Sequence, residues 1–169
     1  MSRGNPQDGV ETLFRDHGTA ILRYFARRVD PVEDTADLMS GVMLTAWRRR
    51  DAIPPPPQDV LWLYGVARNV LANHRRGTRR RTAATQDLAD QLLSAPAHPP
   101  VPSVEVLDVR AAIRSLNEID REILTLSAWE GLTSAEITAV IGLSPSTVRT
   151  RLARARATIR SQLAVETTA

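Results

Sequence analysis

The sequence predicts an all-α protein made of two small helical domains joined by a flexible linker, the C-terminal one with a helix-turn-helix. Apolar residues recur at helical spacing along most of the 169 residues, and no stretch requires a strand. Prolines interrupt that periodicity between Thr82 and Pro102, which we interpret as the linker. Two short helices with capping signals follow closely on one another near the C-terminus. We expect the domains to span residues 7–81 and 103–164, with the linker at 82–102.

Three helices are predicted in the N-terminal domain. The first runs from about Gln7 to Val29 and ends at Asp30-Pro31, because proline disfavours the α conformation of the residue before it. The second runs from about Glu33 to Arg50, and the third from Asp59 to about Arg80, after a proline-rich connector. The predicted buried face of the second helix consists of Met39, Val42, Met43, Ala46 and Trp47.

The third predicted helix carries positive charge without acidic compensation. No acidic residue lies between Val60 and Thr85. The arginines of this span are Arg68, Arg75, Arg76, Arg79, Arg80 and Arg81. Trp62, Asn69 and Asn73 share one face at helical spacing, and arginines among amides and an aromatic ring can hold nucleic-acid backbone and bases. Balancing the helix dipole accounts for the last three arginines only.

The C-terminal domain begins with two further predicted helices. Ser103 is expected to cap the fourth helix, whose apolar stripe is Val106, Val109, Ile113 and Leu116. Asn117 is expected to cap the fifth helix, which continues to Trp129 and is ended by Gly131.

A helix-turn-helix is predicted from Thr133 onward. Thr133 and Glu136 have the spacing of a capping box, and Gly142 can take the left-handed conformation that ends a helix. Ser144 is placed to cap the second helix, and Pro145 fits its first position.

The last helix separates apolar from cationic residues. Its apolar stripe is Val148, Leu152, Ala155, Ile159 and Leu163. The opposite face holds Ser146, Thr150, Ala153 and Arg154. Two shoulders lie between this face and the apolar stripe. One shoulder holds Arg149, Arg156 and Arg160, and the other holds Thr147 and Arg151. No acidic residue lies between Ser144 and Val165, which favours a helix that enters a DNA major groove. A solvated face of an ordinary bundle helix, the alternative, usually mixes both signs of charge.

Composition narrows the class of protein. All 22 basic residues are arginine, and the formal net charge is +3. The absence of cysteine excludes disulfides and thiolate metal sites. No apolar run approaches the ~18 residues of a membrane span, and the N-terminus does not resemble a signal peptide, so we expect a soluble cytoplasmic protein without membrane insertion.

Blocks from both domains together resemble the extracytoplasmic-function (ECF) sigma factors, the small promoter-recognition subunits of bacterial RNA polymerase. The matching stretches run from Asp34 to Ile53, from Trp62 to Arg81 and from Asp120 to Arg160. A helix-turn-helix alone is a weak signal, but the ordered blocks on either side of a linker are specific. The resemblance implies a non-enzymatic factor that binds core RNA polymerase, directs promoter-specific initiation and is controlled by an anti-sigma factor.

The resemblance also implies roles for individual residues. Docking on the clamp helices of the largest polymerase subunit falls to Asp34, Asp37, Leu38 and Gly41. The flap of the second-largest subunit is the other implied polymerase contact. Melting and reading of the −10 element fall to the loop from Asp51 to Gln58 and to Trp62, Asn69, Asn73, Arg75, Arg76, Arg79 and Arg80. Reading of the −35 element falls to Ser146, Thr147, Arg149, Thr150, Arg151, Ala153 and Arg154.

Two positions depart from the family pattern. Gly41 stands where the family usually has an acidic residue, and Ala153 is smaller than the residue that relatives often carry there. These departures bear on the strength of polymerase docking and on one −35 contact.

Two other functions are compatible with a C-terminal helix-turn-helix. A stand-alone helix-turn-helix regulator would need a dimer interface or a ligand pocket, and neither pattern is visible. A recombinase-like enzyme would need a placed serine or tyrosine, or an acidic metal cluster. The acidic group Glu33, Asp34 and Asp37 suits the positive end of a helix dipole better than a metal site. We therefore expect no catalytic residues, no cofactor and no metal.

Overall fold

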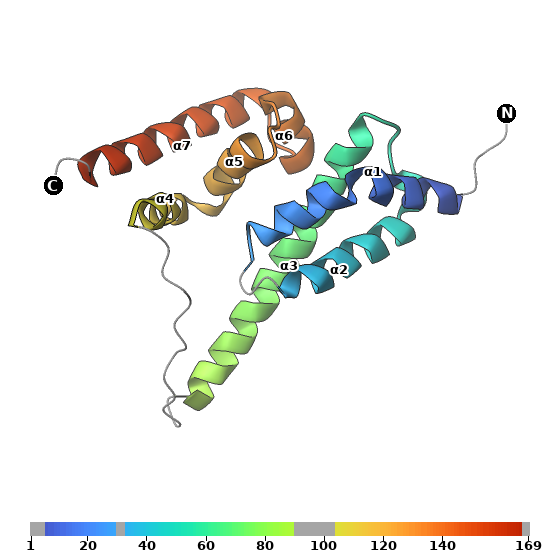
Figure 1. Cartoon of the computed structure of the whole chain (residues 1–169), viewed down its shortest axis with the longest axis horizontal. Helices are drawn as coiled ribbons and strands as arrows, with labels where there is room; N and C mark the ends of the chain where they lie inside the picture. Colours follow the sequence, from blue (N-terminus) through green and yellow to red (C-terminus); the bar gives the residue numbers. More distant parts are fainter. Residues whose placement is uncertain (1–5, 30–32, 90–103, 167–169) are drawn as a thin grey trace. The chain divides into compact units, whose positions relative to one another are not determined.

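The computed structural model describes residues 6–29, 33–89 and 104–166, and all regular structure within those ranges is helical (Figure 1). The chain divides into two compact units, residues 1–95 and 96–169. The predicted all-α class with two helical domains is confirmed. Each unit has its own core and is described separately below.

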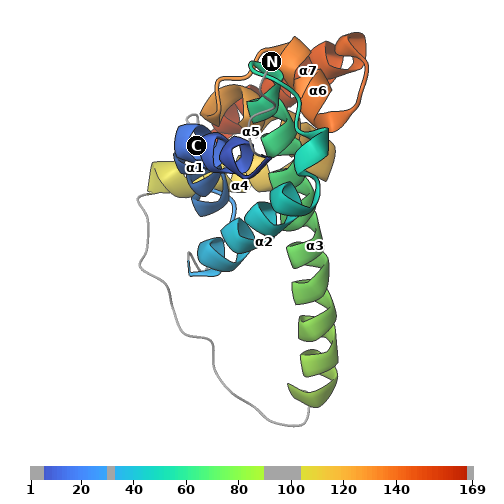
Figure 2. The same ribbon diagram turned by 90° about the vertical axis from the view of Figure 1, so that its right-hand side faces the viewer.

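The first unit is a three-helix arrangement. It contains α1 (Pro6–Ala26), α2 (Asp34–Arg48), the short 3-10 helix η1 (Arg50–Ala52) and α3 (Gln58–Ala89). Helices α1 and α2 pack on each other and on the N-terminal part of α3, whose last turns extend beyond both, as Figures 1 and 2 show. Helix α1 ends three residues before the predicted Val29, and the Asp30-Pro31 break lies outside the described residues.

Aromatic and branched side chains fill the interior of this unit. Tyr24 and Phe25 are fully buried, with their ring centroids 5.4 Å apart in an edge-to-face arrangement. Tyr64 of α3 brings its ring to 5.8 Å from Tyr24. Buried apolar side chains from all three helices therefore hold α3 against α1 and α2.

The predicted buried face of α2 is wrong in part. The side chains that face the interior are Thr35, Leu38, Val42 and Ala46. Met43 and Trp47 are 48% and 43% exposed instead. The cause is close packing, because a Cβ atom at Gly41 would lie 3.2 Å from Val70 Cγ1 on α3. Gly41 permits that approach, and Met43 and Trp47 are exposed instead.

Helix α3 is longer than predicted. The predicted end at Arg80 is wrong, because the helix continues through Ala89. Residues 82–89 contain three alanines and neither glycine nor proline, so nothing in that stretch interrupts a helix. The predicted linker therefore cannot begin at Thr82, and its remaining part, residues 90–102, lies outside the described residues.

The second unit contains four helices: α4 (Val104–Ser115), α5 (Glu118–Trp129), α6 (Ser134–Ile141) and α7 (Pro145–Glu166). Helices α4, α5 and α6 all pack against α7. Ile123, Leu126, Ile137 and Val148 are fully buried between them. The predicted cap at Ser103 lies outside the described residues, as does the side chain of Val106.

The α4–α5 corner is held by polar contacts. The Asn117 side chain accepts a hydrogen bond from the Asp120 backbone N–H at 2.9 Å, which confirms it as the cap of α5. The Arg121 guanidinium donates to the carbonyls of Ile113, Arg114 and Leu116 and so closes the end of α4. Val109 is exposed, contrary to prediction, although Ala112 and Leu116 further along the same helix are buried.

Among the residues that the structure describes, no helix combines the length and the apolar character needed to cross a bilayer. The same residues contain no group of three or more histidine, aspartate or glutamate side chains placed to hold a metal ion.

Candidate nucleic-acid interface

The helix-turn-helix forms through the capping interactions that the sequence predicts. The Thr133 hydroxyl accepts from the Glu136 N–H at 3.3 Å, and the Glu136 carboxylate accepts from the Thr133 N–H at 2.7 Å. This capping box lowers the pKa of Glu136, because the Thr133 backbone N–H and hydroxyl both donate to its carboxylate. Gly142 has a φ of 81° and ends α6 in the left-handed conformation, as expected. The turn therefore has a defined geometry.

Ser144 caps the start of α7. Its hydroxyl accepts from the Thr147 N–H at 3.2 Å and lies 2.8 Å from the Thr147 hydroxyl and 3.0 Å from that of Ser146. Pro145 occupies the first helical position, as predicted. Thr147 is half-buried and engaged with this cap, so its hydroxyl contributes to the geometry of the helix start.

Helix α7 presents one polar face to solvent. Val148, Leu152 and Ala155 are buried, on the side of α7 that packs against the rest of the unit. The predicted −35 residues that lie exposed on the outer face are Ser146, Arg149, Thr150, Ala153 and Arg154. The outer face thus combines two arginines with small polar side chains at the N-terminal end of the helix.

Arg151 does not belong to that exposed face. Its Nη1 donates to Asp120 Oδ1 on α5 at 2.8 Å, and the Asp120 side chain is only 5% exposed. The structure therefore separates Arg151 from the other predicted −35 residues. Sequence spacing alone placed it on a shoulder of α7 and gave no indication of a partner 31 residues earlier.

The predicted −10 residues occupy α3. Asn69 and Asn73 are exposed, Trp62 is half-buried, and the Asn73 side chain accepts a hydrogen bond from Arg76. Arg79 and Arg80 are exposed further along the helix.

Arg75 differs from these residues. It is half-buried, and its Nη2 donates to the Arg28 carbonyl at 3.4 Å, beyond the end of α1. The structure thus gathers the two asparagines and Arg76 on one side of α3 and directs Arg75 toward α1.

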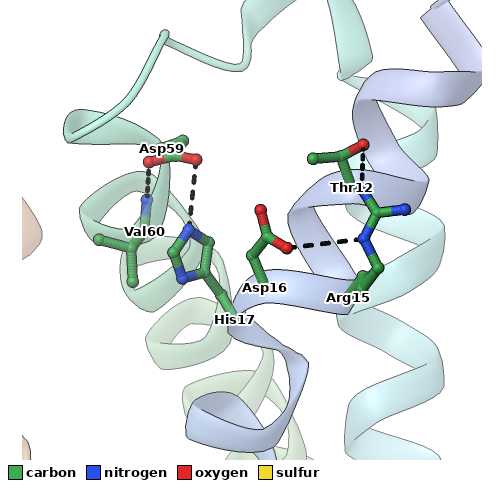
Figure 3. A network of polar contacts seen from close by, with 6 residues as sticks. All are labelled: Thr12, Arg15, Asp16, His17, Asp59 and Val60. Carbon is green, nitrogen blue, oxygen red and sulfur yellow. Dashed lines mark hydrogen bonds and ion pairs between the residues drawn. The ribbon is translucent and has the colours of Figure 1, made fainter.

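A polar contact that the sequence did not reveal fixes the start of α3. His17 Nε2 on α1 lies 3.3 Å from Asp59 Oδ2, and Asp59 Oδ1 accepts from the Val60 N–H at 2.9 Å (Figure 3). Asp59 directly follows the proline-rich connector, so this contact ties the end of the predicted −10 loop to α1. The two residues are 42 positions apart, and neither belongs to a recognisable motif.

The predicted polymerase-docking residues do not form one surface. Leu38 is 3% exposed and belongs to the core, whereas Gly41 is half-buried and lies close to Val70 of α3. Their role in polymerase docking stays a prediction. Asp34 Oδ2 lies 3.1 Å from His74 Nε2 of α3. Asp37 is exposed.

Sequence reasoning missed the exposed apolar side chains of α2, which are Met43, Leu44 and Trp47. Two apolar stripes of helical spacing overlap in this helix, and the larger residues were assigned to the core. Gly41 and Ala46, which allow close approach of a neighbouring helix, were the signal that could have shown which side of α2 is buried.

Comparison with known proteins identifies both units. The Sigma-70 region 2 model matches residues 13–81, and the Sigma-70, region 4 model matches residues 107–159. The RNA polymerase sigma factor CarQ of Myxococcus xanthus is 30% identical over 165 residues, which cover 95% of this chain and 92% of that protein. The probable RNA polymerase sigma factor RfaY of Xanthomonas campestris is 34% identical over 91% of this chain, and the ECF RNA polymerase sigma factor BldN of Streptomyces coelicolor is 28% identical over 90% of it. The chain spans only 39% of the Xanthomonas protein and 59% of the Streptomyces protein.

Two solved structures share the fold. CnrH, solved in complex with the cytosolic domain of CnrY, is 27% identical with a TM-score of 0.67, over 96% of this chain and 91% of that one. The sigma factor RpoE of Bartonella quintana, solved with the anti-sigma factor NepR, is 22% identical with a TM-score of 0.65, over 92% of this chain and 96% of that one.

Two helical units matched in order to sigma-70 regions 2 and 4, the second with a capped helix-turn-helix, define a protein of the sigma-70 class. Within that class, the chain belongs to the extracytoplasmic-function family of RNA polymerase sigma factors.

Proposed function

We propose that the chain binds core RNA polymerase and directs it to specific promoters. The observation that carries this proposal is the presence of two polar, arginine-bearing helix surfaces, on α3 and on α7, one in each matched sigma region. A promoter has two separate elements, and two separate units suit two separate contacts.

The proposed −35 contact is the outer face of α7. Arg149 and Arg154 are exposed there, with Thr150 between them, and a helix with this face fits a major groove. An arginine can bond a guanine edge with two hydrogen bonds, whereas Ala153 can only contact a thymine methyl group. Thr147 is assigned to the helix start and the neighbouring DNA backbone.

The proposed −10 contact is the exposed side of α3. Asn69 and Asn73 supply amides for base edges, and Trp62 supplies a surface on which a base can stack. Arg76, Arg79 and Arg80 are suited to the phosphates of the melted strand. Arg75 is left out of this set because its guanidinium points toward the Arg28 carbonyl.

The proposed polymerase-docking surface lies on α2 and differs from the one expected from sequence. It consists of Asp37 with Met43, Leu44 and Trp47, all of them exposed. Large apolar side chains that stand exposed on the same helix as a carboxylate are typical of a surface that another protein covers. The partner assigned to it is the clamp-helix region of the largest polymerase subunit, with the flap of the second-largest subunit as a separate contact.

We also propose control by an anti-sigma factor. CnrH was solved with the cytosolic domain of CnrY, and it shares 27% identity and the fold with this chain. That likeness supports the binding of a partner protein by this chain as well, and we assign to that partner the role of an anti-sigma factor.

Transcription in vitro with purified core polymerase tests the proposal. The template is a promoter library randomised at both elements, and the transcripts are sequenced. We expect this chain to enrich a two-part motif that core polymerase alone does not enrich. A chain that binds duplex DNA without polymerase, and leaves transcription unchanged, would identify a stand-alone regulator instead.

A further inference from the structure

We infer that the Asp120–Arg151 ion pair is a positioning device that fixes the rotation of α7 on α5 and thereby decides which side chains face DNA. Its consequence for DNA rests on the proposed function, but the positioning itself does not. The inference removes Arg151 from the DNA-contacting set and gives it a different role.

The pair belongs to a small polar network around a buried carboxylate. Asp120 Oδ1 accepts from Arg151 Nη1 at 2.8 Å, and Asp120 Oδ2 accepts from Asn117 Nδ2 at 2.6 Å. Asn117 Oδ1 in turn accepts from the Asp120 backbone N–H at 2.9 Å. Both carboxylate oxygens are thus used, one by the cap of α5 and one by the middle of α7.

Besides the ion pair, α7 is held on α5 by apolar packing and by an exposed contact in which Arg156 Nη2 donates to the Ser127 hydroxyl at 3.2 Å. Apolar packing alone defines the rotation of α7 weakly. Val148, Leu152 and Ala155 are buried along its inner side, and contacts of this kind have little directional preference. The ion pair is directional, because a guanidinium N–H must point at one carboxylate oxygen. Asp120 is buried and Arg151 is half-buried, and a polar pair removed from solvent in this way can specify register where apolar contacts permit several.

The position of Arg151 in α7 also determines where the outer face of the helix points. Arg149, Thr150 and Arg154 lie within three residues of it on the same helix. A helix turns as a rigid body over so short a distance, so a rotation at Arg151 moves these three side chains equally.

The test must remove the pair without leaving a buried charge. A single substitution would strand one partner and destabilise the unit, whereas removal of both charges is often tolerated. Asp120→Asn keeps the shape of that side chain, and its amide oxygen can still accept from Asn117. Arg151→Met keeps an unbranched side chain but removes the guanidinium group. For the distance measurement, Arg154→Met is the matched control, because it removes an exposed arginine from the same helix.

The first readout is the distance between α5 and α7, and it does not depend on function. The chain contains no cysteine, so Ala128→Cys and Ala157→Cys, both at exposed positions, allow two spin labels to be attached to the full chain. We expect one narrow distance distribution in the parent and in Arg154→Met, and a broadened or shifted one in the double variant. The single variant Arg151→Lys, which keeps the charge opposite Asp120, should retain much of the narrow distribution of the parent. An unchanged distribution in the double variant would overturn the inference.

The second readout is −35 discrimination in the promoter-library assay. We expect the preference of the double variant for the best −35 sequence over its single-base variants to fall about tenfold, which corresponds to about 1.4 kcal/mol. Retained discrimination despite an altered distance distribution would refute the link to specificity. If the parent chain itself enriched no promoter motif, the proposed function would be refuted. The label distances would still test whether the ion pair fixes the rotation of α7.

Discussion

His74 on α3 lies with its Nε2 3.1 Å from Oδ2 of Asp34, in the first turn of α2, whereas Asp37 on the same turn is exposed. These two acidic residues, which were expected to have the same role, thus differ in their contacts. Asp34 links α2 to α3, and Asp37 is accessible to a partner. The polymerase-docking proposal therefore depends on Asp37 and on the exposed apolar residues near it.

Asp37→Arg should weaken binding to core polymerase without unfolding the protein. The substitution reverses a charge at an exposed site, so the fold should be unchanged, while a polymerase surface that complements a carboxylate would be repelled. We expect Kd for core polymerase to rise at least about tenfold. Titration of fluorescently labelled chain with core polymerase measures this. Glu33→Arg, at an exposed acid before the same helix, is the matched control, and an equal loss in both variants would indicate general electrostatics only.

The sequence predicted the C-terminal unit better than the N-terminal one, for a physical reason. Caps and turns depend on residues within a few positions of each other, so Asn117, Thr133 and Gly142 could be placed correctly from the sequence alone. The face that a helix buries depends on the neighbours that approach it. The inward side of α2 is decided by Val70, whose proximity to Gly41 no local pattern reveals.

The candidate sites show the same division. The exposed face of α7 follows from helical spacing, but the pairing of Arg151 with Asp120 and of His17 with Asp59 joins residues 31 and 42 positions apart. The continuation of α3 past Arg80 was missed because the expected linker lacked a clear apolar stripe. The helix propensity of residues 82–89, which include no glycine or proline, was sufficient to continue α3 to Ala89.

The capping box of α6 should contribute stability that depends on pH. The folded-state pKa of Glu136 is lowered, so its contribution is fully present above its ordinary pKa and is lost as pH falls through the depressed value. Thr133→Ala should cost about 0.5–2 kcal/mol at neutral pH. Urea unfolding of the full chain, with hydrogen exchange used to follow α6, measures both effects. Ala135→Ser, at an exposed position of the same helix, should show neither the loss nor the pH dependence.

Limited proteolysis should cut the chain between residues 90 and 103. The four prolines of that stretch disfavour a helix, whereas α3 protects its backbone through Ala89. Mass spectrometry of the early fragments should show N-terminal pieces ending after residue 89. First cuts between residues 82 and 89 would mean that the last turns of α3 open readily in solution.

Asn69→Ala should impair promoter opening more than initial promoter binding. An amide can read a base edge only after melting presents it, whereas arginines contact phosphates from the start. Permanganate reactivity of the melted region, compared with closed-complex affinity, separates the two steps. Asn73→Ala should act in the same direction, but it also releases Arg76, so the single Asn69 variant is the sharper test. Equal losses in both assays would indicate damage to α3 itself.

Arg149→Ala and Arg154→Ala should separate base reading from phosphate contact on α7. Both side chains are exposed, so neither loss should affect the fold. Removal of an arginine that makes two hydrogen bonds to a guanine edge should cost about 1–3 kcal/mol of DNA-binding free energy and relax the preference at that base. Removal of an arginine that contacts only phosphate should weaken binding to every sequence and reduce the salt slope by about one.

The measurement is a pair of titrations for each variant, one with core polymerase and one with −35 DNA at several salt concentrations. Arg110→Ala, which removes an exposed arginine of α4 in the same unit, controls for the loss of a positive charge. Affinity for core polymerase should hardly change in any of the three, because the proposed docking residues belong to the other unit. If Arg154→Ala weakened polymerase binding as much as DNA binding, the division of roles between α2 and α7 would be wrong.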